Sequence, residues 1–455
     1  MVNPFGRPFL TTLSRSLHNF YYKQSLKFPC QFSHRNYCSN NENVFAYSAI
    51  FKDKKEAHVS EDKLKDFIPL FSPLMIPNGN QLKSKPRSFK LTDMQKWISQ
   101  QSQAVDPSNI QPEITVKFID GLCMSFKSLS DNELLTVIQF LNHDKNLDSS
   151  LCSTIFSKLD NECIRRLPQW TWNVSCQAMR VWYNLNMVKL CNFYKKAISH
   201  FSPQIQNLNA QQLLEFSFFL NLNRSFPTQL NHRNFETQLL LLWNDFSLDE
   251  IGVISMAFFK CQKEILNPAL LDKLISAVKD NAAVIDDITL AAILKLIRRS
   301  CTDASKTPAS VIKLFDALID EVDRLNPKAI IQLVTVAGSL NYFHHPTLEK
   351  VAKLFTTKIG ATRLKDLERF ALSLSSSGYK SPSVDEFWKE VETELIKSER
   401  QIEIRNFPRS LISLLVYFVT LGKFPEELFK IAFHSENLNK ALGIVLFFFS
   451  FFCYI

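Results

Sequence analysis

Residues 325–342 read LNPKAIIQLVTVAGSLNY, and this stretch decides the fold. A polar start with a proline leads into apolar residues at helical spacing, and the stretch closes on small residues and an asparagine. Apolar positions three or four apart predict a helix with one buried face. A proline fits the first turn of a helix, because the N–H that it lacks has no partner there. The same shape recurs along the chain and indicates a repeat.

Eight segments share this shape, at 129–144, 176–187, 208–224, 246–262, 287–300, 325–342, 364–379 and 407–423. Equivalent apolar anchors recur every 37 to 44 residues, at Leu134, Cys176, Leu213, Ile251, Leu290, Ile330, Leu367 and Leu411. The segments end at matching breaks, for example Ser377-Gly378-Tyr379 and Leu421-Gly422-Lys423. A proline follows each of the later breaks, where it stops one helix and opens the next.

Second helices are predicted between the anchors, for example at 268–278, 308–325, 346–358 and 383–397. One helical hairpin cannot bury its own apolar stripe, whereas stacked hairpins can. We therefore predict an all-α fold, an α-solenoid of about eight helical hairpin repeats over residues 115–441. A non-repetitive α-helical bundle is the alternative.

The flanking segments differ in texture from the repeats. Residues 38–114 are rich in proline and poor in hydrophobic periodicity, so we predict a disordered linker with one short helix at 91–101. Residues 442–455 form a hydrophobic tail that fits no repeat and is too short to span a bilayer. We interpret the tail as an aberrant terminus from a retained intron or truncated gene model. A tail that docks on the last repeat is the alternative.

Residues 1–37 have the composition of a mitochondrial transit peptide. They contain five basic residues, frequent hydroxyl residues and no acid, and they lack the apolar run of a secretory signal. Arg35 lies two residues before Tyr37, as in the pattern of the matrix processing peptidase, so cleavage is expected between Tyr37 and Cys38. This predicts a mitochondrial matrix protein; a disordered basic tail is the alternative.

The net charge does not by itself indicate a nucleic-acid surface. The whole chain carries +9, but removal of the five basic residues of the transit peptide leaves +4 for residues 38–455. That mild excess is compatible with an RNA-binding protein and with a protein-interaction scaffold.

The sequence lacks the motifs of nucleotide binding, metalloprotease chemistry and paired-cysteine metal sites. We therefore predict no enzyme, no cofactor and no metal site. His344 and His345 are interpreted as turn residues, and Asp385 and Glu394 as charges on a solvated helix face. Buried thiols in a core are expected at Cys163, Cys176, Cys191, Cys261 and Cys301.

Basic residues at the ends of neighbouring repeat helices are the candidate RNA-binding residues. They are Lys260, Lys263, Lys295, Arg298 and Arg299. Stacked hairpins present equivalent positions in a row, so these cations are expected to form a stripe that follows phosphates. Cations at helix C-termini are also expected from the macrodipole alone. Tyr342 and Tyr379 occupy matching breaks and offer faces for base stacking, or they only cover the helix ends.

The repeats resemble the N-terminal helical repeats of the FAST kinase-domain family. The resemblance rests on segments such as 129–135, 325–342 and 364–379, covers roughly residues 125–440, and agrees with a transit peptide followed by a linker. It implies a mitochondrial RNA-binding protein without kinase activity. The C-terminal FAST and RAP modules of the family are not found in this sequence.

The resemblance favours one of two functions. The first is binding of mitochondrial mRNA or rRNA in support of transcript processing, stability or translation, with ribosomal or RNA-granule proteins as further partners. The second is a matrix protein-interaction scaffold for ribosome or respiratory-complex assembly, without direct RNA contact. No membrane span is expected in either.

Overall fold

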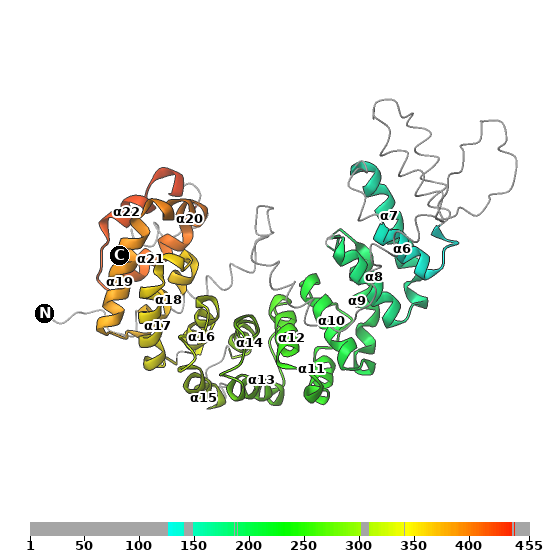
Figure 1. Ribbon diagram of the computed structural model, residues 1–455, viewed down its shortest axis with the longest axis horizontal. Coiled ribbons are helices and arrows are strands. Elements are labelled where there is room, and N and C mark those ends of the chain that lie inside the picture. Colours follow the sequence, from blue (N-terminus) through cyan, green and yellow to red (C-terminus); the bar gives the residue numbers. More distant parts are fainter. Residues whose placement is uncertain are drawn as a thin grey trace, which may run out of the picture. The chain divides into compact units, whose positions relative to one another are not determined.

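The computed structural model describes residues 126–140, 149–185, 187–188, 190–301, 309–340, 342–438 and 441 (Figure 1). The predicted transit peptide, its cleavage residues Arg35, Tyr37 and Cys38, the linker, residues 115–125 and the hydrophobic tail lie outside these ranges. Within them, all regular secondary structure is helical.

Eight helical hairpins follow one another in the described residues. Their first helices are α6 (Asp131–Phe140), α8 (Trp172–Asn184), α10 (Ala210–Asn223), α12 (Leu248–Lys260), α14 (Asp287–Ser300), α16 (Pro327–Leu340), α18 (Leu364–Ser377) and α21 (Pro408–Thr420). Their second helices are α7 (Ser149–Arg166), α9 (Asn192–Phe201), α11 (His232–Leu241), α13 (Pro268–Asp280), α15 (Ala309–Leu318), α17 (His345–Thr357), α19 (Pro382–Ile396) and α22 (Glu426–Ala432). A short helix, α20 (Gln401–Asn406), precedes α21. The prediction of an all-α helical-repeat solenoid is confirmed.

The predicted anchors form the spine of the core. All eight are buried, with at most 5% of the residue surface exposed. Each anchor belongs to the first helix of a hairpin, so the period read from the sequence is the period of the hairpins.

The described residues fall into two compact units. One holds the hairpins from α6 to α11 together with Lys260–Gln262, and the other holds Phe246–Phe259 and the chain from Lys263 onward. Inside the second unit, α14, α16, α18 and α21 pack in succession as one layer of first helices. The second helices pack against one another in the same way, α13 on α15 and α17 on α19.

Four of the breaks between the helices of a hairpin contain a left-handed residue. Arg224, Gln262, Gly378 and Gly422 all have positive φ, between 57° and 72°. A residue in this conformation ends a helix and lets later N–H groups bond its last carbonyls. The N–H of Lys423, for example, donates to the Phe418 carbonyl at 2.9 Å. The small-residue and asparagine breaks of the sequence mark these turns.

One predicted boundary is wrong. The helix expected over 308–325 ends at Leu318, and residues 319–324 form turns. Asp320, Glu321 and Asp323 follow Leu318, and acidic residues are unfavourable at the negative end of a helix. The turns place Arg324 within reach of the preceding hairpin connection.

Carboxylates of one second helix hold the start of the next second helix. Asp160 of α7 accepts hydrogen bonds from the backbone N–H groups of Asn192 and Phe193 at the start of α9, at 2.9 and 2.8 Å. Glu349 of α17 accepts from the Ser383 hydroxyl in the first turn of α19 at 2.8 Å. A carboxylate satisfies N–H groups and complements the positive end of the helix dipole. Each such residue therefore joins adjacent hairpins.

Three arginines close hairpins from the other side, and we call each of them an arginine clasp: Arg166, Arg324 and Arg400. Each lies at the end of a second helix or just after it, and donates to backbone carbonyls in the connection that precedes the same hairpin. Arg166 donates to Phe126 and Leu129, and Arg324 donates to Ala282 and Ile285. The clasp thus ties the beginning of a hairpin to its end.

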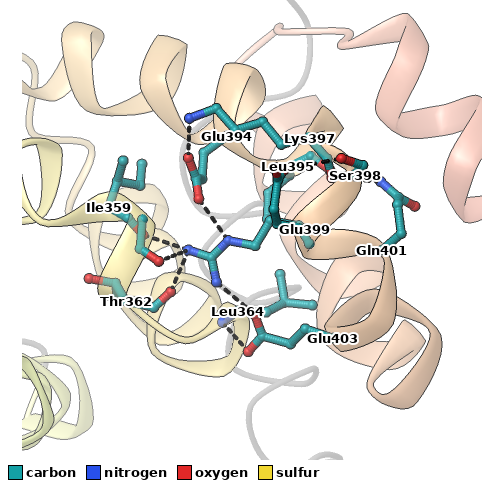
Figure 2. A network of polar contacts seen from close by, with 12 residues as sticks. Ile359, Thr362, Leu364, Glu394, Leu395, Lys397, Ser398, Glu399, Gln401 and Glu403 are labelled. Carbon is teal, nitrogen blue, oxygen red and sulfur yellow. Dashed lines mark hydrogen bonds and ion pairs between the residues drawn. The ribbon is translucent and has the colours of Figure 1, made fainter.

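Arg400 makes the most extensive clasp (Figure 2). Its guanidinium donates to the carbonyls of Ile359 and Thr362 at 2.6 and 2.8 Å, and pairs with the carboxylates of Glu394 and Glu403 at 2.9 and 2.7 Å. Glu394 is only 6% exposed, so its interpretation as a charge on a solvated face is wrong. Asp385 is exposed, as expected, and pairs with Lys423.

The five cysteines expected in the core are all buried thiols, which confirms that prediction. Two of them are also hydrogen-bond donors, since the Cys176 and Cys191 thiols donate to Glu215 and Asp160 at 3.1 and 2.8 Å. Burial raises the pKa of the Cys163 thiol to about 12 and that of Cys301 to about 11. These thiols stay protonated at neutral pH and are poor nucleophiles.

Candidate nucleic-acid interface

The last turn of α14 carries two of the predicted RNA-binding residues, Arg298 and Arg299. The N-cap residue of the helix is Asp286, whose side chain accepts from the N–H groups of Ile288 and Thr289 at 2.8 and 3.0 Å. The last turn carries two cations, the charge that the C-terminus of a helix favours. This end of α14 is therefore positive for local reasons alone.

The connection between α12 and α13 lies against this end of α14. The N–H of Ile265 donates to the Ser300 hydroxyl at 2.9 Å. Lys263 is two residues before Ile265, and Arg298 and Arg299 directly precede Ser300. The structure therefore brings Lys263 to the same edge as the two arginines.

Lys295 lies one turn earlier on α14, with its ammonium 5.8 Å from the centre of the Phe259 ring. Such a contact is a cation–π interaction, and it holds the lysine stem against α12. Lys263, Lys295, Arg298 and Arg299 are all half-buried. We call these four residues the α14 cation cluster. They are less exposed than an ordinary solvated lysine.

Lys260 is the last residue of α12 and groups with the first unit. The fifth predicted residue is therefore at a helix end, as expected, but it is described separately from the α14 cation cluster. The assignment of RNA binding to all five residues stays a prediction.

Tyr342 and Tyr379 lie at the hairpin breaks, and each has a histidine against one face. Tyr342 stacks on His344 with ring centres 6.4 Å apart, and Tyr379 stacks on His345 at 4.7 Å. The two histidines begin α17 and contact different groups, so they do not face one ligand. His344 also lies 3.3 Å from a carboxylate oxygen of Asp316.

The described residues contain no cluster of histidine, cysteine and acidic side chains suited to a metal ion. In this same part of the chain, no helix is long and apolar enough to cross a bilayer. What the structure does present is a stack of helical hairpins with a cationic helix end, an arrangement that suits binding of an extended polyanion.

Comparisons with known proteins identify similar chains. The chain is similar to the curated protein "FAST kinase domain-containing protein 5, mitochondrial" of Mus musculus, at 23% identity over 253 residues, 55% of this chain. The Homo sapiens and Pongo abelii proteins of that name are 21% identical over 244 residues. The matched segment covers about a third of the length of these relatives, 31–32%. No family model matches the chain.

The resemblance to the FAST kinase domain-containing family is thus confirmed at low identity, over about 55% of the chain. Sequence reasoning missed other exposed groups beside the tyrosines, namely His345, Lys380 and Phe424. The sequence contains no motif at these residues. Their position is the signal, because each lies at or just after one of the matching breaks.

Proposed function

We propose that this chain is a mitochondrial matrix protein that binds RNA and supports transcript processing, stability or translation. The observation that carries the proposal is the α14 cation cluster, which lies around the C-terminal end of helix α14 in a stack of hairpins. The similarity to relatives that are named mitochondrial, from a family of RNA-binding proteins, supports it. No catalytic step is part of the proposal, and ribosomal or RNA-granule proteins are its expected protein partners.

RNA binding is tested with the full chain and a fluorescently labelled, unstructured RNA. The variant Arg298→Glu/Arg299→Glu should bind roughly tenfold more weakly, because charge reversal stops these side chains from neutralising phosphates. Its plot of log affinity against log salt should flatten by about 0.7 for each phosphate that is no longer neutralised. Fluorescence anisotropy at several salt concentrations measures both quantities.

The matched control is Lys279→Glu/Lys313→Glu, which changes the net charge equally on exposed positions of second helices α13 and α15. Its affinity and salt slope should remain close to those of the unmodified protein. Equal losses in both variants would show that net charge, and not the α14 cation cluster, governs binding. If the unmodified protein retains no RNA, the scaffold function replaces this proposal.

Import is tested with a fusion of residues 1–45 to a fluorescent protein. We expect mitochondrial fluorescence, and a mature N-terminus at Cys38 when the full chain is imported. A cytosolic or secretory signal from the fusion would contradict the localisation.

A further inference from the structure

The last three connections between first and second helices adjoin one another in the second unit. They are the connections α16–α17, α18–α19 and α21–α22. His345 at the start of α17 stacks on Tyr379 of the next connection. Asp385 at the start of α19 pairs with Lys423 of the connection after that, at 3.1 Å. These contacts make one continuous edge from hairpin to hairpin.

Each connection brings an aromatic ring to this edge. Tyr342 and Tyr379 are half-buried, His345 is exposed, and Phe424 is 70% exposed. The His345 and Tyr379 rings are nearly parallel, with an interplanar angle of 22°. A nucleobase extends such a stack in the same geometry, because aromatic rings prefer offset parallel packing.

Basic side chains accompany the rings. Lys380 directly follows Tyr379 and is exposed, and Lys423 directly precedes Phe424. Gly378 and Gly422, the left-handed residues of the two breaks, come just before these pairs. One turn geometry therefore places an aromatic residue and a lysine at the edge in two consecutive hairpins. We define the aromatic edge as Tyr342, His345, Tyr379, Lys380, Lys423 and Phe424.

Three carboxylates near the aromatic edge have partners in or beside these connections. Glu349 accepts from the Ser381 hydroxyl at 2.5 Å and from the Tyr379 hydroxyl at 3.3 Å. Asp316 pairs with His344, and Asp385 with Lys423. The charges of these carboxylates disfavour phosphates close to them. They do not prevent a base from stacking on the rings.

One second helix beside this edge repels a polyanion. Helix α19 carries five acidic residues, Asp385, Glu386, Glu390, Glu392 and Glu394, against the single Lys389. The last turn of α14 is different, since it carries Arg298 and Arg299 and no acidic residue. A phosphate backbone is thus favoured at this end of α14 over α19.

We propose that the aromatic edge binds the bases of single-stranded RNA by stacking, while the α14 cation cluster holds phosphates one hairpin earlier. This inference rests on the proposed RNA-binding function and adds the form of RNA and a surface for it. Stacking on rings is tolerant of base identity, so the edge favours unpaired RNA over a particular sequence.

The test compares two polyanions on the full chain, labelled oligouridylate, which has bases, and inorganic polyphosphate, which has none. The variant His345→Ala/Phe424→Ala removes two exposed rings and no lysine, arginine or acidic residue. Its affinity for oligouridylate should fall between about fivefold and a hundredfold, the range expected when base stacking is removed. The salt slope and the affinity for polyphosphate should stay unchanged, because the variant keeps every lysine and arginine.

Phe407→Ala is the matched control, because Phe407 is a 54% exposed phenylalanine at the start of α21, at the opposite end of that helix from Phe424. It should leave both affinities unchanged. Helicity and thermal unfolding of each variant show that the fold is kept.

Unchanged oligouridylate binding by His345→Ala/Phe424→Ala would overturn the inference while leaving the proposed function in place. Equal losses for oligouridylate and polyphosphate would also overturn it, because the rings would then not act by stacking. If the unmodified protein binds no RNA, the proposed function fails first. Photocrosslinking from position 424 in mitochondria then tells whether the edge contacts a protein instead.

Discussion

Arg400 binds two carboxylates and the carbonyls of the preceding connection from a position that is 8% exposed. Burial of a guanidinium is unfavourable, and it is offset only while every partner is in place. Arg166 has the same character, with Glu162 and Asp131 as its partners at 2.8 and 2.7 Å. The clasps are therefore sensitive points of the array.

Replacement of Arg400 by methionine should destabilise the protein by about 3–5 kcal/mol, because two carboxylates and several carbonyls are left without their donor. Arg405→Met, on an exposed position of α20, is the control and should change the stability by less than about 0.5 kcal/mol. Urea unfolding followed by circular dichroism measures both. A destabilisation no larger than that of the control would refute the role of the clasp.

The clasp also predicts how stability depends on pH. Burial opposes the charge on Glu394, but hydrogen bonds from Lys397 and Arg400 outweigh it and hold the pKa of Glu394 below its ordinary value of 4.5. A depressed carboxyl pKa stabilises the fold above the unfolded pKa, and this stability is lost as the pH falls through the folded pKa.

Glu394→Gln should therefore be less stable than the unmodified protein at neutral pH, and the difference should shrink as the pH falls below about 4.5. Unfolding curves recorded across the acid range test this expectation. A difference that stays constant over that range would mean that ionisation of Glu394 contributes nothing to stability.

At the scale of the helices, left-handed residues end four of the first helices, α10, α12, α18 and α21. Gly378 and Gly422 adopt positive φ, and a Cβ added at either position meets nothing within 4 Å. The cost of a side chain there is thus purely that of the backbone conformation. Arg224 adopts the same conformation with a side chain attached.

Gly378→Ala should accordingly destabilise the protein by about 1–2 kcal/mol, the cost of a left-handed non-glycine residue, and Arg224→Gly should stabilise it by about 1 kcal/mol. Both effects should appear in the denaturation midpoint with helicity unchanged. Effects of the same sign in the two variants would argue against a conformational origin.

The hairpin period was predictable from the sequence because every anchor meets the same requirement. Each one must be apolar to be buried on the same side of a first helix. Leu134 and Leu411, at the two ends of the series, are both fully buried. The clasps were not predictable, because their partners are mainly backbone carbonyls that carry no residue signature. Their positions also drift, since Arg166, Arg324 and Arg400 precede the next anchor by ten, six and eleven residues.

The candidate interface was predictable only in part. The positions of Arg298 and Arg299 follow from the end of a periodic helix. The contact of Lys295 with Phe259 and the stack of His345 on Tyr379 join different hairpins, and a single sequence does not show which residues meet across hairpins.

Across the whole molecule, stacked hairpins contact mainly their neighbours, so stability is expected to be local. Arg400→Met should raise amide hydrogen exchange in α17 to α22, near the clasp, and leave the exchange of α8 to α10 unchanged. Hydrogen exchange followed by mass spectrometry resolves these helices. Uniformly faster exchange in both regions would indicate that the array unfolds as one cooperative body.

The carboxylate contacts and the arginine clasps point in opposite directions along the chain. The two kinds of contact must therefore form in a fixed order as the chain is synthesised. Asp160 and Glu349 are synthesised before their partners. They can accept hydrogen bonds only after the start of the next second helix has emerged. The clasps reach back to a connection that already exists. The chain is synthesised from its N-terminus onward, so each folded hairpin offers a surface on which the next one can pack. The hydrogen bonds of a clasp can form only after its arginine has left the ribosome or the import channel. Each hairpin is therefore fully stabilised only at that moment.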